Sequence, residues 1–460
     1  MTVDRLKLIV GPKGWLTSEN DMQPYLSEWR DRYKGKASIV LAPASTEEVA
    51  AIVSICAAES IAIVPQGGNT GLCGGAIPDD SGKQIVVSLR RMNKIRSVSP
   101  DNFSMVVDAG CTLVQVQQAA SAAGRYFPLS LAAEGSCQIG GNLSTNAGGI
   151  NVLQYGTARA QVFGLEVVLP DGRVIDGLRA LRKDTAGYDL NQLFIGAEGT
   201  LGIITGACLR LQPAINDVST FMVAIPSPAA AVRLLSDLRE SLGDALQAFE
   251  LIPDRAIRFV TRHIPGTRNP FEETYPWYVL AACTGPLSVI ENSLALALEK
   301  DHALDALIAK NSSESDALWK IRHTISEAQK HEGVSLKHDI SIPVDRIGEF
   351  MEVADAAIMR HVPNARIVAF GHVGDGNVHW NVSQPKSTSA EQFLQEREAV
   401  AKIVYDIVDD FGGSFSAEHG IGQARRHYLR QYRSQAELDT MRAIKSALDP
   451  QGLMNPGKVL

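Results

Sequence analysis

The chain has 460 residues, of which 45% are hydrophobic and 21% are charged, and its formal net charge is -7. This composition is ordinary for a globular protein, and the negative charge argues against a nucleic-acid-binding surface. The length favours two domains over one core. Its apolar runs stay short of the ~18 residues that span a bilayer, and the first residues lack the apolar run of a secretory signal.

Six cysteines are scattered along the chain without a C-x-x-C pair: Cys56, Cys73, Cys111, Cys137, Cys208 and Cys283. This spacing argues against a zinc ribbon and against a disulfide framework. It is typical of a reducing compartment, and we therefore expect a cytoplasmic protein.

Residues 38–43 predict a short strand, and a capping box at Ser45 and Glu48 predicts a helix that continues to about Ser60. A second strand over residues 61–64 leads into PQGGNTGLCGG, residues 65–75. Glycines let backbone N–H groups converge on an anion. The pattern is neither a Walker A nor a Rossmann motif. Alone, it indicates a structural loop as readily as a phosphate-binding loop.

Two further stretches are rich in Gly, Ser, Thr and Asn: GSCQIGGNLSTNAGG (residues 135–149) and GAEGTLGIITG (residues 196–206). A hairpin with its turn at Asp171-Gly172 separates them. Three stretches of small residues can line one narrow groove, and a dinucleotide needs such a groove for its pyrophosphate and its flat ring. A purely structural protein has little need for three.

After Gln212-Pro213 the composition changes. Strands are predicted over residues 221–225, 248–252 and 277–283, and helices over residues 228–242 and 287–308. This alternation indicates an antiparallel sheet backed by helices. Residues 263–276 contain three prolines and no periodic pattern, so we expect an exposed loop.

The predicted helix over residues 315–330, capped by Ser315, places Arg322 and Ser326 on one face, and Lys337 follows on the strand VSLKHDISIP. A solvated basic face is the ordinary interpretation of such a helix. Its amphipathic character and the nearby lysine favour an anion-binding role. The neighbouring His338 and Asp339 receive no role.

The segment GHVGDGNVHWNV (residues 371–382) predicts a β-hairpin with a two-residue turn at Asp375-Gly376. This register places His372 opposite His379, close enough for both imidazoles to bind one metal ion, with Asn381 on the same face. Two polar histidines on a solvated sheet are the alternative.

A predicted helix over residues 389–411 ends at Gly412-Gly413, and SAEHGIG (residues 416–422) follows. In extended backbone, Glu418 and His419 would point in opposite directions. That arrangement would suit a metal ligand beside a general base.

The three glycine-rich segments and the hairpin resemble the vanillyl-alcohol-oxidase-type (PCMH) FAD family, and the sequence is most similar to its D-2-hydroxyglutarate and D-lactate dehydrogenases. The resemblance extends from about Ser38 to NPGK at residues 455–458. It implies an α+β, two-domain PCMH-type FAD-binding fold. Residues 1–212 would form the FAD-binding domain from two α/β subdomains, residues 213–415 an antiparallel-sheet substrate (cap) domain with the metal-binding hairpin, and residues 416–460 a segment that returns to the FAD domain.

The resemblance implies non-covalent FAD, because the first loop has no histidine for covalent attachment, and it leaves Cys73 and Cys137 as packing residues. The implied cofactor-binding residues are Pro65, Gln66, Gly67, Gly68, Asn69, Thr70, Gly71, Leu72, Gly135, Ser136, Ile139, Gly140, Gly141, Asn142, Thr145, Asn146, Gly148, Gly149, Glu198, Gly199, Gly202, Ile203, Ile204 and Asn455.

The implied metal ligands are His372, His379 and Glu418, a donor set that suits Zn²⁺ without excluding Mn²⁺ or Fe²⁺. His419 would be the catalytic base and would also contact the substrate. Arg322, Ser326 and Lys337 would bind a distal carboxylate, although the relatives have Thr in place of Ser326, and Asn381 would bind the carboxylate beside the hydroxyl.

The expected reaction is oxidation of D-2-hydroxyglutarate to 2-oxoglutarate by a FAD- and metal-dependent D-2-hydroxy acid dehydrogenase, with hydride transfer to the flavin. The electrons would leave to an external acceptor, either electron-transfer flavoprotein or a quinone. D-Lactate and D-malate are alternative substrates. A metal-free alcohol oxidase and a non-catalytic flavoprotein are the rival classes, and a homodimer is one candidate assembly.

Overall fold

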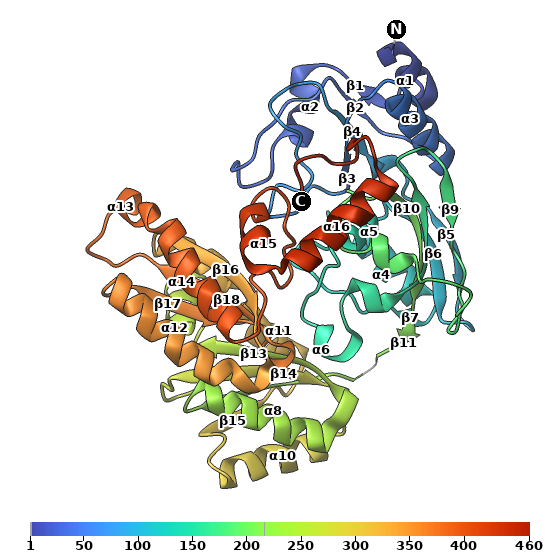
Figure 1. The fold of residues 1–460 in the computed structure, drawn as a ribbon. Coiled ribbons are helices and arrows are strands. Elements are labelled where there is room, and N and C mark those ends of the chain that lie inside the picture. The colour runs from blue at the N-terminus through green and yellow to red at the C-terminus, as the bar shows by residue number, and fades with distance from the viewer. Residues whose placement is uncertain (1, 216) are drawn as a thin grey trace. The chain divides into compact units, whose positions relative to one another are not determined.

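The structure, a computed structural model, describes residues 2–215 and 217–460 (Figure 1). Its contacts divide the chain into two compact units. The first comprises the residues up to 148 together with 156–214 and 418–460, and the second comprises residues 149–155 and 215–417. The sequence did not predict that residues 149–155 belong to the second unit. No helix in the described ranges is long and apolar enough to cross a bilayer.

A small mixed sheet opens the first unit. Its strand order is β1 (Trp15–Leu16), β2 (Ile39–Leu41), β4 (Ile85–Ser88), β3 (Ile63–Gln66), with β2, β4 and β3 parallel. Its helices are α1 (Thr2–Val10), α2 (Glu19–Leu26) and α3 (Thr46–Ala58). Ser45 caps α3 as predicted, but the Glu48 carboxylate accepts from the amide of Ala44, so the capping box is only half formed. Alternate residues of β2 enter apolar clusters on opposite sides of the sheet.

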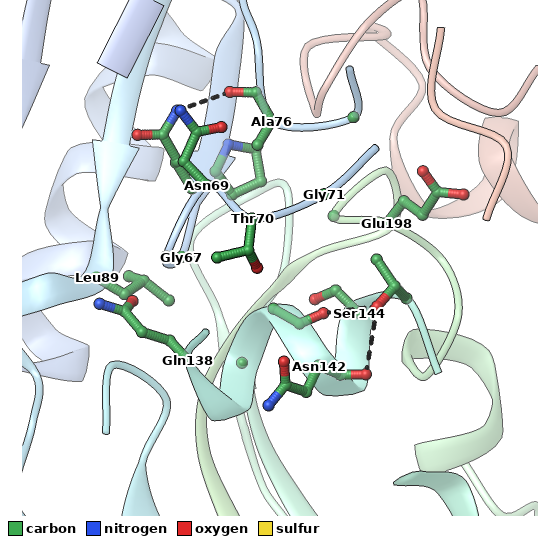
Figure 2. A pocket seen from close by; sticks show the side chains of 18 of the residues that line it. Gly67, Asn69, Thr70, Gly71, Ala76, Leu89, Gln138, Asn142, Ser144 and Glu198 are labelled. Atoms are coloured by element: carbon green, nitrogen blue, oxygen red, sulfur yellow. Dashed lines mark hydrogen bonds between the residues drawn. The ribbon is translucent and has the colours of Figure 1, made fainter. Parts of the chain in front are cut away.

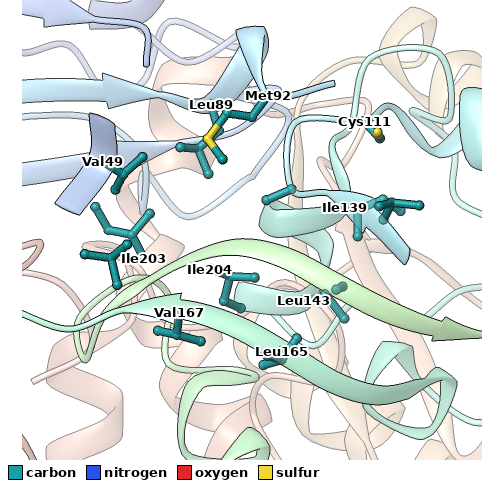
Figure 3. Close-up of a cluster of buried hydrophobic side chains, with 14 of the residues drawn as sticks. Val49, Leu89, Met92, Cys111, Ile139, Leu143, Leu165, Val167, Ile203 and Ile204 are labelled. Atoms are coloured by element: carbon teal, nitrogen blue, oxygen red, sulfur yellow. The ribbon is translucent and has the colours of Figure 1, made fainter. Parts of the chain in front are cut away.

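An antiparallel five-stranded sheet forms the other part of the first unit. Its order is β5 (Ile95–Ser99), β6 (Ser104–Asp108), β10 (Ile203–Arg210), β8 (Val162–Val168), β9 (Val174–Asp176). Around it lie α4 (Leu113–Ala122), α5 (Ile139–Ser144), α7 (Asn191–Phe194), η1 (Leu89–Arg91), η2 (Ala158–Gln161) and the ladder of β7 (Arg125–Tyr126) with β11 (Gln212–Pro213). Buried side chains of β8, β10 and α5 belong to one apolar cluster (Figure 3).

The end of the chain completes the first unit with α15 (Arg426–Tyr432) and α16 (Gln435–Leu448). Beyond α16, the backbone lies beside β3. The Ile63 amide donates to the carbonyl of Leu453, and the Asn455 amide donates to the carbonyl of Ile63, both at 2.8 Å. The first unit is therefore built from both ends of the chain.

The second unit contains a four-stranded antiparallel sheet with the order β13 (Leu246–Pro253), β14 (Trp277–Cys283), β12 (Ser219–Ile225), β15 (Asp305–Ile308). Helices α9 (Asp254–His263) and α11 (Ser312–His331) pack on one face through a shared apolar cluster. The other helical elements near this sheet are α6 (Val152–Tyr155), α8 (Pro228–Leu242), η3 (Gly243–Ala245) and α10 (Leu287–Glu299).

A three-stranded antiparallel sheet carries the histidines, with the order β16 (Ser335–Ser341), β18 (Asn377–Ser383), β17 (Arg366–Phe370). Its other elements are η4 (Val344–Arg346), α12 (Ile347–His361), η5 (Val373–Asp375), α13 (Ala390–Gln395) and α14 (Arg397–Asp410). Asp339 pairs with His379 and Lys337 with Asn381 across β16 and β18. Opposed residues share a face, so these four side chains lie on the same side of the sheet.

The predicted register of the histidine hairpin is wrong by two residues. Phe370, not His372, lies opposite His379, and residues 371–376 form a longer loop that contains η5. Gly371, at φ 144°, leaves the hairpin and exchanges two backbone hydrogen bonds with Leu251 of β13, at 2.9 and 3.1 Å. The loop nevertheless brings the rings of His372 and His379 to a distance of 5.5 Å.

Four predicted elements differ from the structure. The helix predicted over residues 287–308 ends at Glu299, because Asp301 at φ 57° turns the chain and β15 then pairs with β12. The predicted loop 263–276 is preceded by α9, which the sequence analysis missed. Asn311, rather than Ser315, caps α11. The predicted helix 389–411 is divided into α13 and α14 at Glu396.

Trp380 provides a test of the small sheet. It is fully buried and packs edge-on against Phe350 of α12, at a ring distance of 5.4 Å. We expect Trp380→Ala to lower the free energy of unfolding by about 3–5 kcal/mol because it leaves a large cavity. Trp380→Phe should cost much less, since it keeps the aromatic contact and removes an indole N–H that has no partner among the described atoms. Urea unfolding followed by circular dichroism measures both; equal midpoints for wild type and Trp380→Ala would contradict the packing.

Candidate active site

The three glycine-rich segments line one groove in the first unit (Figure 2). Seventeen of the predicted cofactor residues lie in its lining: Pro65, Gln66, Gly67, Gly68, Asn69, Thr70, Gly71, Leu72, Gly140, Gly141, Asn142, Thr145, Glu198, Gly199, Gly202, Ile203 and Ile204. The lining also includes Cys73, Gly75, Ala76, Leu89, Gln138, Ser144 and the predicted base His419. Cys73 is buried and its thiol is unoxidised, in keeping with a packing residue.

The glycines of the groove have two different functions. A Cβ on Gly68 would lie 2.0 Å from the carbonyl oxygen of Ser136, and one on Gly140 would lie 2.8 Å from the Cβ of Ala109. These glycines therefore let neighbouring segments pack. Gly71 and Gly141 line the groove, and a Cβ on either would meet nothing within 4 Å. Their bare backbone leaves the groove open.

A dinucleotide suits this groove for a second reason. The side-chain oxygen Oε1 of Gln138 is buried in the lining and has no hydrogen-bond partner among the described atoms. A buried polar atom without a partner costs free energy. A ligand with a polar ring edge would satisfy it, as FAD would.

The first loop is held by an N-terminal segment that the sequence analysis did not connect with it. The Asn69 amide donates to the carbonyls of Pro24 and Ser27, at 3.2 and 2.9 Å. Arg32 donates to the carbonyl of Leu72 at 2.8 Å, and the buried Glu28 carboxylate accepts from Arg32 in turn. Predicting these contacts requires knowing the fold, because about 40 residues separate the partners.

Glu198 supports the segment that contains His419. Its carboxylate accepts hydrogen bonds from the amides of Ile421 and Gly422, at 2.7 and 2.8 Å. Burial raises the pKa of Glu198, although these two donors oppose the rise. Gly420 is required here, because a Cβ at this position would lie 2.7 Å from the Glu198 carboxylate. Glu198 thus fixes the backbone immediately after His419.

Seven predicted cofactor residues, all within the described part of the chain, lie outside the lining: Gly135, Ser136, Ile139, Asn146, Gly148, Gly149 and Asn455. Asn455 donates to the carbonyls of Gly75 and Glu198, at 2.9 and 2.7 Å, and so ties two lining segments together. Asn146 accepts from the amide of Arg159. Gly149 belongs to the second unit. The structure gives these three positions structural contacts instead of a place in the groove.

The backbone at Glu418 and His419 is bent, not extended. Their candidate ligand atoms lie within 4.8 Å of each other, so the expectation that they point in opposite directions is wrong. Ala417 donates to the carbonyl of Asp339 at 3.2 Å, which anchors the backbone next to Glu418 on β16.

His372 and His379, both in the second unit, offer ligand atoms that lie within 4.8 Å of each other; the predicted third ligand, Glu418, belongs to the first unit. Two imidazoles and a carboxylate are a donor set that Zn²⁺ accepts. The His372 Nδ1 atom hydrogen-bonds Glu250, and the His379 Nδ1 atom lies 3.6 Å from the Asp339 carboxylate. Carboxylates in these positions favour a proton on Nδ1, which leaves the Nε2 lone pair for a metal.

Glu250 is the residue that sequence reasoning missed. It stands in β13, is fully buried, and accepts a hydrogen bond of 2.6 Å from Nε of Arg322 as well as the one from His372. Burial alone would raise the pKa of Glu250, but the charges of Arg322 and His372 outweigh it and lower the pKa to about 2. The only signal in the sequence was one acidic residue within the apolar strand LQAFELIP.

The residues predicted to bind substrate lie on or near one face of the small sheet. Arg322 is 8% exposed, and its guanidinium lies over the Phe370 ring at 4.8 Å. None of the described residues accepts a hydrogen bond from its Nη groups. Lys337 is exposed on β16, and Ser326 is exposed one turn after Arg322 on α11. Asn381 is buried and donates to Gln329 at 2.8 Å, which uses part of its hydrogen-bonding capacity.

Two protein families match successive parts of the chain. Residues 37–177 match the FAD binding domain family, and residues 216–459 match the family described as FAD linked oxidases, C-terminal domain. p-Cresol methylhydroxylase has a TM-score of 0.77 at 16% identity, with 100% of this chain and 96% of that chain covered. Alkyldihydroxyacetonephosphate synthase has a TM-score of 0.76 at 18% identity, with 99% and 84% covered. The fold and the groove define a FAD-dependent oxidoreductase of the PCMH type, as predicted.

The D-2-hydroxyglutarate dehydrogenase of Stutzerimonas stutzeri is 36% identical over 99% of this chain and 98% of its own length. The mitochondrial D-2-hydroxyglutarate dehydrogenase of Arabidopsis thaliana is 36% identical over 100% of this chain and 81% of its own length. The chain belongs to the D-2-hydroxyglutarate dehydrogenase family of FAD-linked oxidases.

Gly68 and Gly71 distinguish the two functions of glycine in the groove. We expect Gly68→Ala to lower the stability of the protein even without FAD, on the order of 1–3 kcal/mol, because the new methyl group overlaps the Ser136 carbonyl. Gly71→Ala should leave the stability of the apoprotein unchanged and weaken FAD binding only. Thermal unfolding of both apoproteins and FAD titration measure the contrast; equal melting temperatures for the two variants would contradict it.

Proposed function

We propose that the chain oxidises D-2-hydroxyglutarate to 2-oxoglutarate with FAD and a divalent metal, most simply zinc. The proposal is supported by the activity that the relatives' names state. The observation that carries it concerns two cations: Lys337 lies on the same face of the small sheet as the candidate metal ligand His379, and Arg322 lies over the Phe370 ring opposite His379. A substrate with a carboxylate at each end matches such an arrangement.

The distal carboxylate would bind Arg322 and Lys337. Glu250 holds Nε of Arg322, so the Nη groups remain for a carboxylate, and Lys337 adds a mobile point charge. Ser326 supplies a hydroxyl on the same helix face as Arg322. Asn381 would hydrogen-bond the carboxylate beside the reacting hydroxyl.

Proton removal is assigned to His419, which lines the flavin groove, because an imidazole is the side chain best suited to accept a proton near neutral pH. Glu198 holds the backbone after His419 and thereby orients it. His372, His379 and Glu418 would hold the metal. When bound, the metal supplies a Lewis acid for the substrate's oxygen atoms, and FAD supplies the acceptor for the hydride that leaves C2.

The two electrons would then pass to an external acceptor, and electron-transfer flavoprotein or a quinone would serve. The cysteines in the described part of the chain form no disulfide bonds, which supports a reducing compartment, and we propose the cytoplasm. D-Malate would use the same two cations with a shorter substrate, and D-lactate would leave them without a partner. These two acids are the alternative substrates.

Anaerobic titration tests the substrate. We expect D-2-hydroxyglutarate to bleach the oxidised-flavin absorbance rapidly, and D-lactate to do so weakly. Lys337→Met should lower kcat/KM for D-2-hydroxyglutarate by about 10–100-fold, the value of one charge-assisted hydrogen bond, and leave that for D-lactate unchanged. If the wild type preferred D-lactate, Arg322 and Lys337 would not bind a distal substrate carboxylate. No bleaching by D-2-hydroxyglutarate, D-lactate or D-malate in metal-loaded protein would refute the dehydrogenase.

His419→Ala tests the base. We expect turnover to fall about 10²–10⁴-fold, because the hydroxyl proton loses its acceptor. The flavin spectrum and the metal content should match those of the wild type, since neither depends on the imidazole. Steady-state and single-turnover kinetics measure the effect. Unchanged turnover would remove His419 from this role.

A further inference from the structure

Glu250 is the charged residue of β13, a strand that is otherwise apolar except for Gln247. All eight residues of β13 are buried, and Glu250 has no exposed surface. A buried carboxylate is tolerated only where charged or hydrogen-bonding partners compensate for the lost water. The identity of those partners therefore indicates why the charge is there.

Each oxygen of Glu250 has a different partner. Oε2 accepts from Nε of Arg322, on α11, and Oε1 accepts from Nδ1 of His372, in the loop after β17. The Asp375 carboxylate also interacts electrostatically with Glu250. The chain is brought there by the bridge between Gly371 and Leu251, the residues next to His372 and Glu250.

We propose that Glu250 is a positioning residue that sets both the metal-binding tautomer of His372 and the orientation of the Arg322 guanidinium. This inference rests on the proposed function, since it concerns the same metal ligands and the same substrate carboxylate. One buried carboxylate would thus fix a group at each end of the substrate. This one side chain would then affect both the affinity of the site for the metal and its selectivity for a substrate with two carboxylates.

Only a group that accepts from both sides can do this. Glutamine has the same shape, but its amide NH₂ donates. If the NH₂ group faces His372, it favours a lone pair on Nδ1 and a proton on Nε2, and the ring can no longer give Nε2 to a metal. If it faces Arg322, two donors oppose each other. Glu250→Gln therefore changes the hydrogen-bonding direction with almost no change of volume.

The chain offers a matched control in Glu332. This carboxylate also lies in the second unit, is largely buried, and bonds a histidine and two arginines: His263 Nε2 at 2.8 Å, Arg366 Nη1 at 2.6 Å and Arg262 Nη1 at 2.8 Å. None of the three partners is a candidate metal ligand. Glu332→Gln makes the same chemical change away from the proposed site.

The measurement is the Zn²⁺ affinity of the full-length, FAD-loaded protein by competition with a chromophoric chelator. We expect Glu250→Gln to weaken Zn²⁺ binding about 10–100-fold, as loss of a residue behind a metal ligand does. Glu332→Gln should match the wild type, and His372→Ala should show the full loss. Glu250→Asp keeps the acceptor and should bind Zn²⁺ more tightly than Glu250→Gln, which separates hydrogen-bonding direction from packing.

At saturating Zn²⁺, kcat/KM of Glu250→Gln should fall further for D-2-hydroxyglutarate than for D-lactate, because Arg322 is no longer held. Zn²⁺ affinity of Glu250→Gln within twofold of the wild type would overturn the inference, as would a wild type that binds no Zn²⁺. Failure of the proposed function looks different: metal-loaded wild type would not be bleached by D-2-hydroxyglutarate, while the affinity differences among the variants would persist.

Discussion

A carboxylate without access to water must have its charge compensated by the protein, and in the second unit this constraint falls on Glu250. Its two partners come from separate elements, α11 and the loop that follows β17. Their positions in turn fix the place of Phe370 beneath Arg322 and beside His379. The face that carries the candidate ligands is organised around this one buried charge.

The periodicity of hydrophobic residues and the residues typical of turns predicted much of the fold, and the errors in the prediction have identifiable causes. Strand β14 and helix α8 occur where the sequence placed them. The hairpin register failed because Gly371 bonds to Leu251, about 120 residues earlier, and a local turn rule cannot include that bond. The histidines nevertheless meet, because the loop after β17 brings the His372 ring to 5.5 Å from the His379 ring. The role of Glu250 could not be predicted from the sequence for the same reason, because its partners Arg322 and His372 are distant from it in sequence.

The flavin groove shows a similar division. The clusters of small residues in the sequence identified most of the groove lining, because backbone segments can approach each other or a ligand closely only where glycine removes the side chain. They could not separate glycines that pack, such as Gly68, from glycines that leave space, such as Gly141. The hydrogen bonds from Arg32 to the carbonyl of Leu72 and from Asn455 to the carbonyl of Gly75 each join segments that are distant in sequence. No periodicity or motif reports such contacts.

The pairing of β3 with the end of the chain affects how the protein is made. Ile63 meets Leu453 only after about 390 further residues have been added, which takes roughly 20–80 s at cellular rates of synthesis. Until then the edge of the first sheet has unpaired backbone groups, which are a template for association with other chains. A chain that lacks the segment around Leu453 would therefore leave the β3 edge of the first sheet open, so the exposed edge persists until that segment has been made and has docked.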